Sequence, residues 1–376
     1  MLVTVLRRVA LLLLAFAAAA AADSATLIQA SCASSSVRIR VAPAGASAAA
    51  EPVVQARRAA CGGGASDPSA LTFGNINAAF SPLLAVTRVA DGVVLLSEVA
   101  GSRAQAPRGE RDALGQPLFE SAIAFSFAPG TRIYGLGEHK TGRVDYAAGA
   151  GFFWRFEDSQ NKATLADNGD ITLPVLHLST GLTLAVNVAS YGSVRVLGSN
   201  AGGVELTLNS SAVLDLWVSV ADAGEPTWPS LMGHLAALVG PPAPLPAWAT
   251  GFIQCKLRYR DQAELLAAAQ GYVDRGYPLS AIVIDYMSWP QFGSWSYIER
   301  CWPDPAGMVR QLDAWGIALV QSVWPNIETA SPHFPDMLKR GFLTLNASGV
   351  PEEFNKFDCM AGEPHPPGPT ATTHLN

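Results

Sequence analysis

The sequence predicts a multidomain chain in which an N-terminal antiparallel β-sandwich is followed by an incomplete (β/α)8 TIM barrel. Between residues 26 and 240, short segments of alternating apolar and polar residues are separated by Gly, Pro, Asn, Ser or Asp, a pattern typical of sandwich strands. After residue 248, strand-like and helix-like segments alternate instead, as they do in the βα units of a parallel barrel. About three such units precede residue 358, whereas a closed barrel of this kind needs eight.

The composition is that of a large globular chain. Of its 376 residues, 49% are hydrophobic and 15% are charged, so the chain can bury a sizeable core and has room for two or more domains. The net charge of -6 offers no attractive surface to nucleic acid or to anionic lipid, and we expect neither as a partner.

The first 22 residues have the order of a secretory signal peptide. Arg7 and Arg8 precede the apolar run 9–21, and the residues before Asp23 are small. A membrane anchor is the alternative, but the run is shorter than the ~20 apolar residues that span a bilayer. We therefore expect residues 1–22 to direct the protein into the secretory pathway, where it is secreted or reaches a vacuolar or lysosome-like compartment, with no membrane attachment in its mature form.

The cysteines and histidines predict no metal site and no cofactor. No C-x-x-C run occurs, and the six histidines lack H-x-H or H-E-x-x-H spacing, which a metal centre on neighbouring residues would need. Cys32 and Cys61 both follow the signal peptide in the first mature domain and could form a disulfide in an oxidising compartment. The sequence leaves open whether these two cysteines are paired.

The chain behind the signal peptide divides by composition into four parts. Residues 26–240 form the predicted sandwich domain, and 241–248 form a linker, because proline fixes φ and removes a hydrogen-bond donor. Residues 249–358 form the first βα units of the barrel, and 359–376 have no barrel-like pattern, which predicts a disordered or artefactual tail. The strand-like segments of the sandwich are 36–43, 83–89, 92–99, 122–129, 171–179, 182–188, 204–209 and 213–220.

In the barrel part, apolar strands alternate with helices that carry their own start and stop signals. A short strand is predicted at 250–255, with Cys255 buried at its end as a small hydrophobic residue. Asp261 is expected to cap a helix that Gly276 ends, because aspartate accepts from free amide groups and glycine adopts positive φ. The remaining predicted elements are strands at 281–284 and 317–323 and helices at 304–314 and 335–341.

Several runs of residues are shared with a known family. The barrel part contains GFIQCKLRYR at 251–260, IDY at 284–286, PDPAGM at 303–308 and VWP at 323–325, and the sandwich contains YGLGEH at 134–139. In order and spacing these runs resemble glycoside hydrolase family 31, and within it the α-xylosidase-like branch. The resemblance covers most of the mature chain, and it implies the same sandwich and barrel that the alternation of segments predicts.

The resemblance implies a retaining α-glycosidase that hydrolyses terminal α-xylosides or α-glucosides in carbohydrate metabolism. Members of the family use an aspartate nucleophile on the fourth barrel strand and an aspartate acid/base after the sixth, and this chemistry needs two carboxylates about 5 Å apart. The family's nucleophile run resembles Trp-x-Asp-Met-Asn-Glu, which does not occur in this sequence. We therefore expect no catalytic residue in this chain, both aspartates downstream of Asn376, and no turnover by the chain alone.

Three residues are predicted to bind the substrate. Asp285 follows four apolar residues at a strand end, and by resemblance it matches the aspartate that binds sugar hydroxyls; the alternative is a helix cap or a loop ion pair. By resemblance, Trp324 lines the same pocket with an apolar face; the alternative is an ordinary aromatic residue of the hydrophobic core. Trp289 lies on the loop after the second strand, where packing and substrate contact are equally expected.

Two alternatives to an enzyme remain open. The chain could be a non-catalytic carbohydrate-binding protein that keeps the sandwich and part of the pocket. It could also be a non-functional truncated product. In each case an oligosaccharide or glycoside is the only partner class that the sequence suggests. The sequence does not distinguish xylose from glucose as the sugar.

Overall fold

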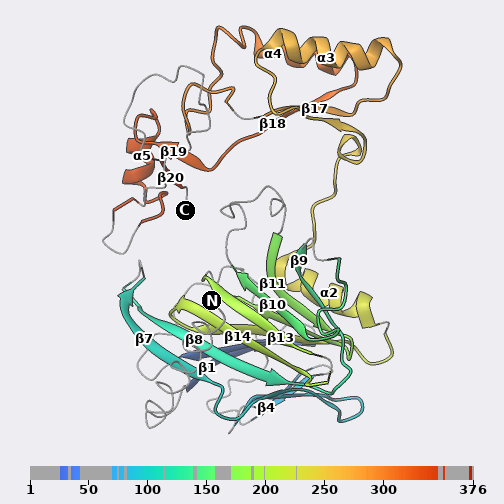
Figure 1. The fold of residues 1–376 in the computed structure, drawn as a ribbon, viewed down its shortest axis with the longest axis vertical. Helices are drawn as coiled ribbons and strands as arrows, with labels where there is room; N and C mark the ends of the chain where they lie inside the picture. The colour runs from blue at the N-terminus through green and yellow to red at the C-terminus, as the bar shows by residue number, and fades with distance from the viewer. Residues whose placement is uncertain are drawn as a thin grey trace. The chain divides into compact units, whose positions relative to one another are not determined.

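The computed structural model describes residues 26–32, 35–42, 70–73, 76–79, 83–112, 115–138, 142–156, 171–187, 190–198, 200–225, 227–285, 287–345, 350–351 and 372–374. The chain separates into two compact units, Met1–Pro242 and Ala243–Asn376, each described by itself (Figure 1). The division lies within the proline-rich segment 241–248. The predicted signal peptide and Cys61 lie outside the described residues, so the export signal and the Cys32–Cys61 disulfide stay predictions.

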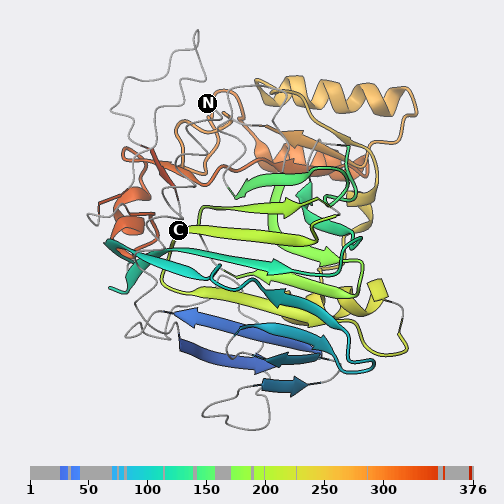
Figure 2. The ribbon, with the colours of Figure 1, turned by 60° about the horizontal axis from the view of Figure 1, so that its bottom comes forward.

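The first unit contains two antiparallel sheets. Six strands form one sheet, and nine form the other, in which β7 pairs only with β8. The strands of the first unit run side by side in Figure 2. The six-stranded sheet has the order β1 (Thr26–Cys32), β2 (Ser36–Ala42), β15 (Leu214–Val220), β12 (Leu182–Val186), β11 (Ile171–Leu178), β9 (Ile133–Glu138). The nine-stranded sheet has the order β10 (Gly151–Phe156), β13 (Gly192–Leu197), β14 (Gly203–Ser211), β8 (Pro117–Ser126), β6 (Val94–Glu98), β5 (Ala85–Arg88), β4 (Ile76–Ala79), β3 (Ala70–Phe73), with β7 (Ala104–Arg111) beside β8.

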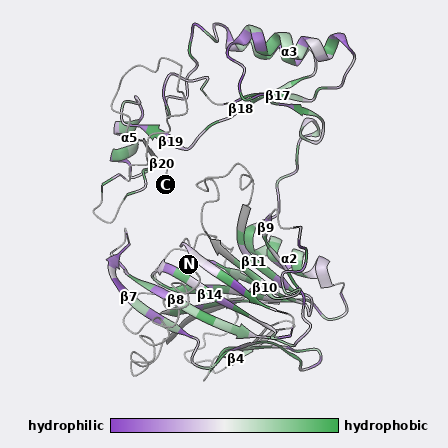
Figure 3. Cartoon of the chain, in the orientation of Figure 1, coloured by the Kyte–Doolittle hydropathy of each residue, from purple (hydrophilic) through white to green (hydrophobic). Residues whose placement is uncertain are grey.

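A single hydrophobic core joins the two sheets. Val37 and Ile39 of β2 share it with Phe125 of β8 and Leu206 of β14. Along these strands every second residue enters the core, because successive side chains point to opposite faces. The strands of this unit accordingly carry both hydrophobic and hydrophilic residues (Figure 3). The alternation that predicts strands in the sequence is therefore the pattern that builds the core.

On the other face of the six-stranded sheet, the polar residues of β2 are also buried. Arg38 Nε lies 3.0 Å from Asp215 Oδ1, and Arg40 Nε lies 3.6 Å from Asp215 Oδ2. Asn187 Nδ2 donates to the same carboxylate over 3.2 Å. One aspartate thus compensates two buried guanidinium groups across neighbouring strands.

A helix that the sequence analysis did not predict ends the first unit. α2 (Thr227–Val239) buries Leu231 and Leu238, and His234 Nε2 lies 2.9 Å from Asp222 Oδ2. Burial raises the pKa of Asp222, but hydrogen bonds from Ser35 and His234 outweigh it and hold this pKa below its ordinary value. The segment 26–240 therefore does not consist of strands alone.

The second unit begins with a short parallel sheet. β16 (Ile253–Gln254), β17 (Ala281–Ile284) and β18 (Ala318–Gln321) pair in parallel. α3 (Gln262–Asp274) and α4 (Pro305–Ala314) connect them and lie along this sheet in Figure 1. The other elements of the unit are η3 (Ala247–Thr250), β19 (Asn326–Glu328), α5 (Phe334–Lys339) and β20 (Thr372–His374).

The caps and core of this unit explain its helices. Asp261 Oδ1 accepts from Glu264 N over 2.8 Å, and Gly276 has φ +68° just after α3, so the predicted start and stop signals of this helix are confirmed. Leu265 of α3 and Leu312 of α4 are buried in one cluster with Ile282 and Ile284 of β17. The helices therefore cover the sheet through their apolar faces.

Two sequence predictions need correction here. The strand predicted at 250–255 is reduced to β16, because a 3-10 helix occupies Ala247–Thr250. Cys255 is exposed, and not buried as expected. Within the predicted tail 359–376, the three residues of β20 pair antiparallel with β19; the rest of this tail lies outside the described residues. Within the described part of the chain, no helix is both long and apolar enough to cross a membrane.

The buried carboxylate of Asp215 should be a major determinant of stability in the first unit. Asp215→Ala leaves Arg38 and Arg40 without their counter-charge in a buried environment, and we expect a loss of about 3–5 kcal/mol. Glu205→Ala, which breaks the half-exposed cross-strand pair with Arg195, is the matched control and should cost at most about 1 kcal/mol. Urea unfolding followed by circular dichroism measures both, and equal losses would contradict the assignment.

Candidate functional site

Parallel pairing brings three strand ends to one edge of the small sheet. Ile253 pairs with Ala281, and Ala281 pairs with Ala318, so the strands are in register from their first paired residues. Cys255 follows the end of β16, and Asp285 follows the end of β17 directly. In α/β proteins the carboxyl ends of parallel strands carry the ligand sites. A ligand-binding site is therefore expected at this edge.

Asp285 lies half-buried at this edge, beside the thiol of Cys255. Cys255 Sγ is 3.9 Å from Asp285 Oδ2 and donates a weak hydrogen bond to it. Partial desolvation of the thiol, followed by the negative charge of Asp285, raises the pKa of the exposed Cys255. The thiol therefore stays protonated at neutral pH and can remain a donor to the carboxylate. The sequence predicted a role for Asp285 but not for its neighbour Cys255. The parallel pairing of β16 with β17 is the signal that places the two residues side by side.

The two predicted tryptophans belong to one aromatic cluster. Met287, Trp289 and Phe292 are buried together, and Trp324 packs against them. Phe292 lies between the two indoles, with ring centroids 6.1 Å from Trp289 and 5.7 Å from Trp324. Trp289 is only 7% exposed, and its buried Nε1 has no hydrogen-bond partner among the described residues. The structure thus brings Trp289 and Trp324 together, and substrate contact by either stays a prediction.

A buried glutamate holds together the two loops that carry this cluster. Glu328, 6% exposed, accepts from Phe292 N over 3.2 Å, and its own N donates to Phe292 O over 3.1 Å. Ser331 Oγ donates to Gly293 O over 2.9 Å. Gly293 has φ +78°, and a Cβ there would lie 2.8 Å from Ile327 Cβ. The loop after β17 is therefore fixed against the segment that follows β18.

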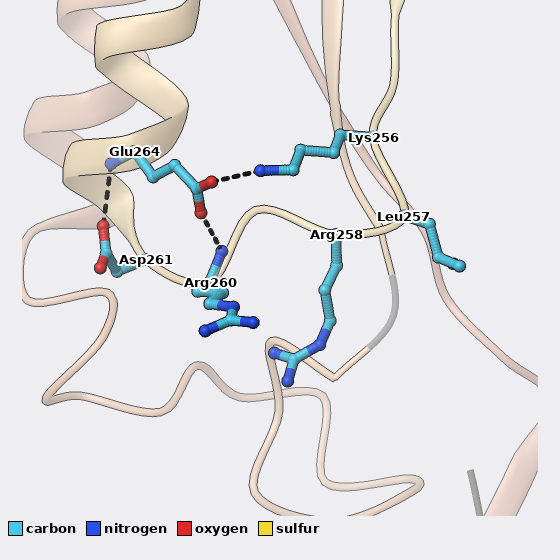
Figure 4. Close-up of a pocket in the computed structure, with 6 residues that line it drawn as sticks. All are labelled: Lys256, Leu257, Arg258, Arg260, Asp261 and Glu264. Carbon is cyan, nitrogen blue, oxygen red and sulfur yellow. Dashed lines mark hydrogen bonds and ion pairs between the residues drawn. The ribbon is translucent and has the colours of Figure 1, made fainter. Parts of the chain in front are cut away.

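A pocket of about 390 Å³ lies where the chain leaves β16 and enters α3 (Figure 4). We call it the basic pocket, because three of its residues are cationic. The sequence did not predict this pocket, because the run at 251–260 was interpreted only as part of the family resemblance. Its lining residues are Lys256, Leu257, Arg258, Arg260, Asp261 and Glu264. Among the described residues, no cluster of histidine, cysteine, aspartate and glutamate could hold a metal ion.

Comparison with known proteins identifies the family. Residues 242–368 match the family model described as "Glycosyl hydrolases family 31 TIM-barrel domain". The "Uncharacterized family 31 glucosidase ORF2" of Pseudescherichia vulneris is 31% identical over 232 residues, which are 62% of this chain and 40% of that protein. Residues 242–368 thus carry a domain of glycoside hydrolase family 31. "Alpha-xylosidase A" of Aspergillus niger is 29% identical, over 61% of this chain and 29% of that protein.

Solved structures of the family share the fold. A GH31 α-xylosidase from a soil metagenome, solved in complex with xylose, matches with a TM-score of 0.67 at 24% identity, covering 91% of this chain and 49% of that one. A xylosidase from Aspergillus niger matches with a TM-score of 0.70 at 22% identity, covering 91% and 47%. The chain thus spans less than half the length of these relatives.

Removal of the buried Glu328 carboxylate should loosen the aromatic cluster. Glu328→Ala leaves the buried Phe292 N–H without its acceptor and should lower the free energy of unfolding by about 1–3 kcal/mol. Glu328→Gln, which keeps one carbonyl oxygen, should lose less. The control is Glu299→Ala at an exposed position of the same loop, with a change within about 0.5 kcal/mol. Urea unfolding monitored by tryptophan fluorescence checks this, and a result in which Glu299→Ala costs as much would refute it.

Proposed function

We propose that this chain forms part of a retaining α-glycosidase that hydrolyses terminal α-xylosides or α-glucosides. The single observation that carries the proposal is the edge of the parallel sheet, where Asp285 follows β17 and the cluster of Trp289 and Trp324 occupies the loops after β17 and β18. A carboxylate at a strand end and aromatic rings on the loops of the same edge suit a sugar, which offers hydroxyl groups and an apolar C–H surface. The names of the relatives, an α-xylosidase and a family 31 glucosidase, support this class of substrate.

The proposal includes a finer account of the fold. The six- and nine-stranded sheets are the two layers of a β-sandwich, and their shared core supports this assignment. The parallel strands with their connecting helices are the first βα units of a TIM barrel. The match of residues 242–368 to a TIM-barrel family model supports this second assignment.

The catalytic carboxylates belong, in this proposal, to parts of the enzyme outside residues 1–376. A retaining mechanism needs a nucleophile and an acid/base about 5 Å apart, and the family's nucleophile run does not occur in the sequence. The contribution of this chain is to bind and orient the sugar. Asp285 would accept hydrogen bonds from sugar hydroxyls, and the Trp324 ring would cover the C–H face. Trp289, whose Nε1 is buried, would support Trp324 through Phe292.

The proposal also places the protein in the secretory pathway, either secreted or in a vacuolar or lysosome-like compartment. The charged, apolar and small-residue order of residues 1–22 supports this location. A pair of cysteines at positions 32 and 61 would suit an oxidising compartment.

Replacement of Asp285 in the complete enzyme should impair substrate use far more than folding. Asp285→Ala removes a charge-assisted hydrogen bond and leaves a sugar hydroxyl unpaired, so kcat/KM for p-nitrophenyl α-xyloside or α-glucoside should fall by roughly 10². Asp285→Asn keeps one acceptor and should lose less. The melting temperature should hardly change, because the residue lies at a strand end.

Asp274→Ala, at the exposed end of α3, is the matched control and should keep kcat/KM. Near-normal turnover by Asp285→Ala with a much lower melting temperature would make Asp285 a structural residue. Sugar binding without hydrolysis by the complete protein would instead indicate a carbohydrate-binding function.

A further inference from the structure

The loop that follows β17 presents one large aromatic ring to solvent. Trp295 is 43% exposed, and its ring lies nearly parallel to that of His333, with ring centroids 5.0 Å apart and an angle of 27° between the rings. The imidazole covers one face of the indole, and an exposure of this size leaves the other face open. This pair, which we call the outer stack, is a second aromatic surface on the loops that carry the cluster of Trp289 and Trp324.

A buried hydroxyl group holds both members of the outer stack. Ser331, 2% exposed, donates through Oγ to Gly293 O over 2.9 Å and accepts from His333 N over 3.2 Å. Gly293 lies two residues before Trp295, so one serine fixes the backbone next to each ring. The stack is thus formed before a ligand arrives, and preorganisation of this kind lowers the entropic cost of binding.

The backbone of Trp295 has an unfavourable conformation. Its φ is +45°, in the left-handed region that bulky residues rarely adopt and glycine adopts without strain. Bonds on both sides maintain it: Gln291 Nε2 donates to Ala330 O over 2.8 Å, and Ile298 N donates to Ser288 O over 2.9 Å. A large ring that strains the chain and remains exposed contributes little to folding, which points to a ligand as its partner.

The loop of the outer stack starts at the proposed sugar-binding edge. Its first residues follow Asp285, and Ser288 Oγ accepts from Gln321 Nε2 of β18 over 3.1 Å. The start of the loop is therefore fixed to two neighbouring strand ends, where barrel enzymes bind their substrates. An aromatic ring offers an apolar surface to the C–H face of a sugar. The outer stack is thus suited to a neutral sugar unit.

We propose that the outer stack binds a sugar unit of an oligosaccharide substrate beyond the unit that is cleaved. This inference rests on the proposed function, because it takes Asp285 as the position of the cleaved sugar. The open face of Trp295 packs against the C–H surface of the further unit, and His333 supports the ring from behind. Oligosaccharides are then bound more tightly than the terminal sugar alone.

The test uses the full chain of residues 1–376 and ligand-observed NMR. D-xylose is compared with a cellotetraose that carries α-1,6-linked xylose, and D-glucose with isomaltotetraose. In at least one pair the oligosaccharide should bind about tenfold more tightly than the monosaccharide, since stacking on one ring is worth a factor of this size. Trp295→Ala should remove most of that advantage, and Trp295→Phe should keep part of it, because an aromatic ring remains.

Two further variants separate binding from folding. Trp248→Ala is the matched control: Trp248 is 40% exposed but precedes β16, at the amino ends of the strands, so its removal should leave the oligosaccharide advantage unchanged. Trp295→Gly relieves the positive φ, so the melting temperature should hardly change while the advantage is lost. Circular dichroism of each variant measures the melting temperature.

Equal binding of oligosaccharide and monosaccharide in both pairs overturns the proposal, as does an advantage that survives Trp295→Ala or that Trp248→Ala removes equally. A much lower melting temperature of Trp295→Gly also overturns it, because Trp295 would then be a structural residue. Monosaccharide binding by Asp285→Ala is measured separately. If it is unchanged while the Trp295 effect holds, the role of Asp285 in the proposed function is refuted and the outer stack remains. If it is lost and Trp295 has no effect, this inference alone is refuted.

Discussion

The parallel register of β16, β17 and β18 is the constraint on which the functional half of this chain depends. β16 pairs with the first two residues of β17, and β18 pairs with β17 along its whole length, so the end of β17 cannot move without breaking the ladder to β18. Asp285 is attached directly to that end, and Ser322 N donates to Ile284 O over 2.9 Å to hold the neighbouring chain beside it. The carboxylate is thus positioned by backbone hydrogen bonds. A site built on strand ends in this way needs few ordering interactions of its own.

The loop after β17 needs a different kind of support, because its described residues 287–300 form no strand. Glu328 supplies it by binding the backbone of Phe292 at both its N–H and its C=O. The aromatic rings of Trp289 and Trp324 then meet across Phe292. A buried carboxylate is costly unless it is hydrogen-bonded, and the bond from Phe292 N supplies that partner to Glu328. The arrangement of the aromatic rings at this edge therefore depends on a buried polar residue, Glu328.

The sequence predicts what depends on local patterns and fails where distant contacts decide. Helix α3 could be predicted from Asp261 and Gly276, because a cap and a stop act within a few residues. The strand predicted at 250–255 is shortened to β16, because Thr250 belongs to a 3-10 helix and pairing with β17 begins only at Ile253. Helix α2 was missed although its buried residues Leu231, His234 and Leu238 recur at helical spacing, because the whole segment 26–240 had been assigned to strands. The basic pocket, likewise, depends on how the Lys256 side chain reaches Glu264.

The contact between His234 and Asp222 has a consequence for acidic surroundings. A carboxyl group whose folded pKa is lowered contributes stability above its unfolded pKa, and loses it only as the pH falls through the folded value. In mildly acidic medium Asp222 therefore remains charged and keeps its contact with His234. The attachment of α2 to the end of β15 is thus built to survive moderate acidification. Helix α2 would therefore stay attached to the first unit in acidic surroundings.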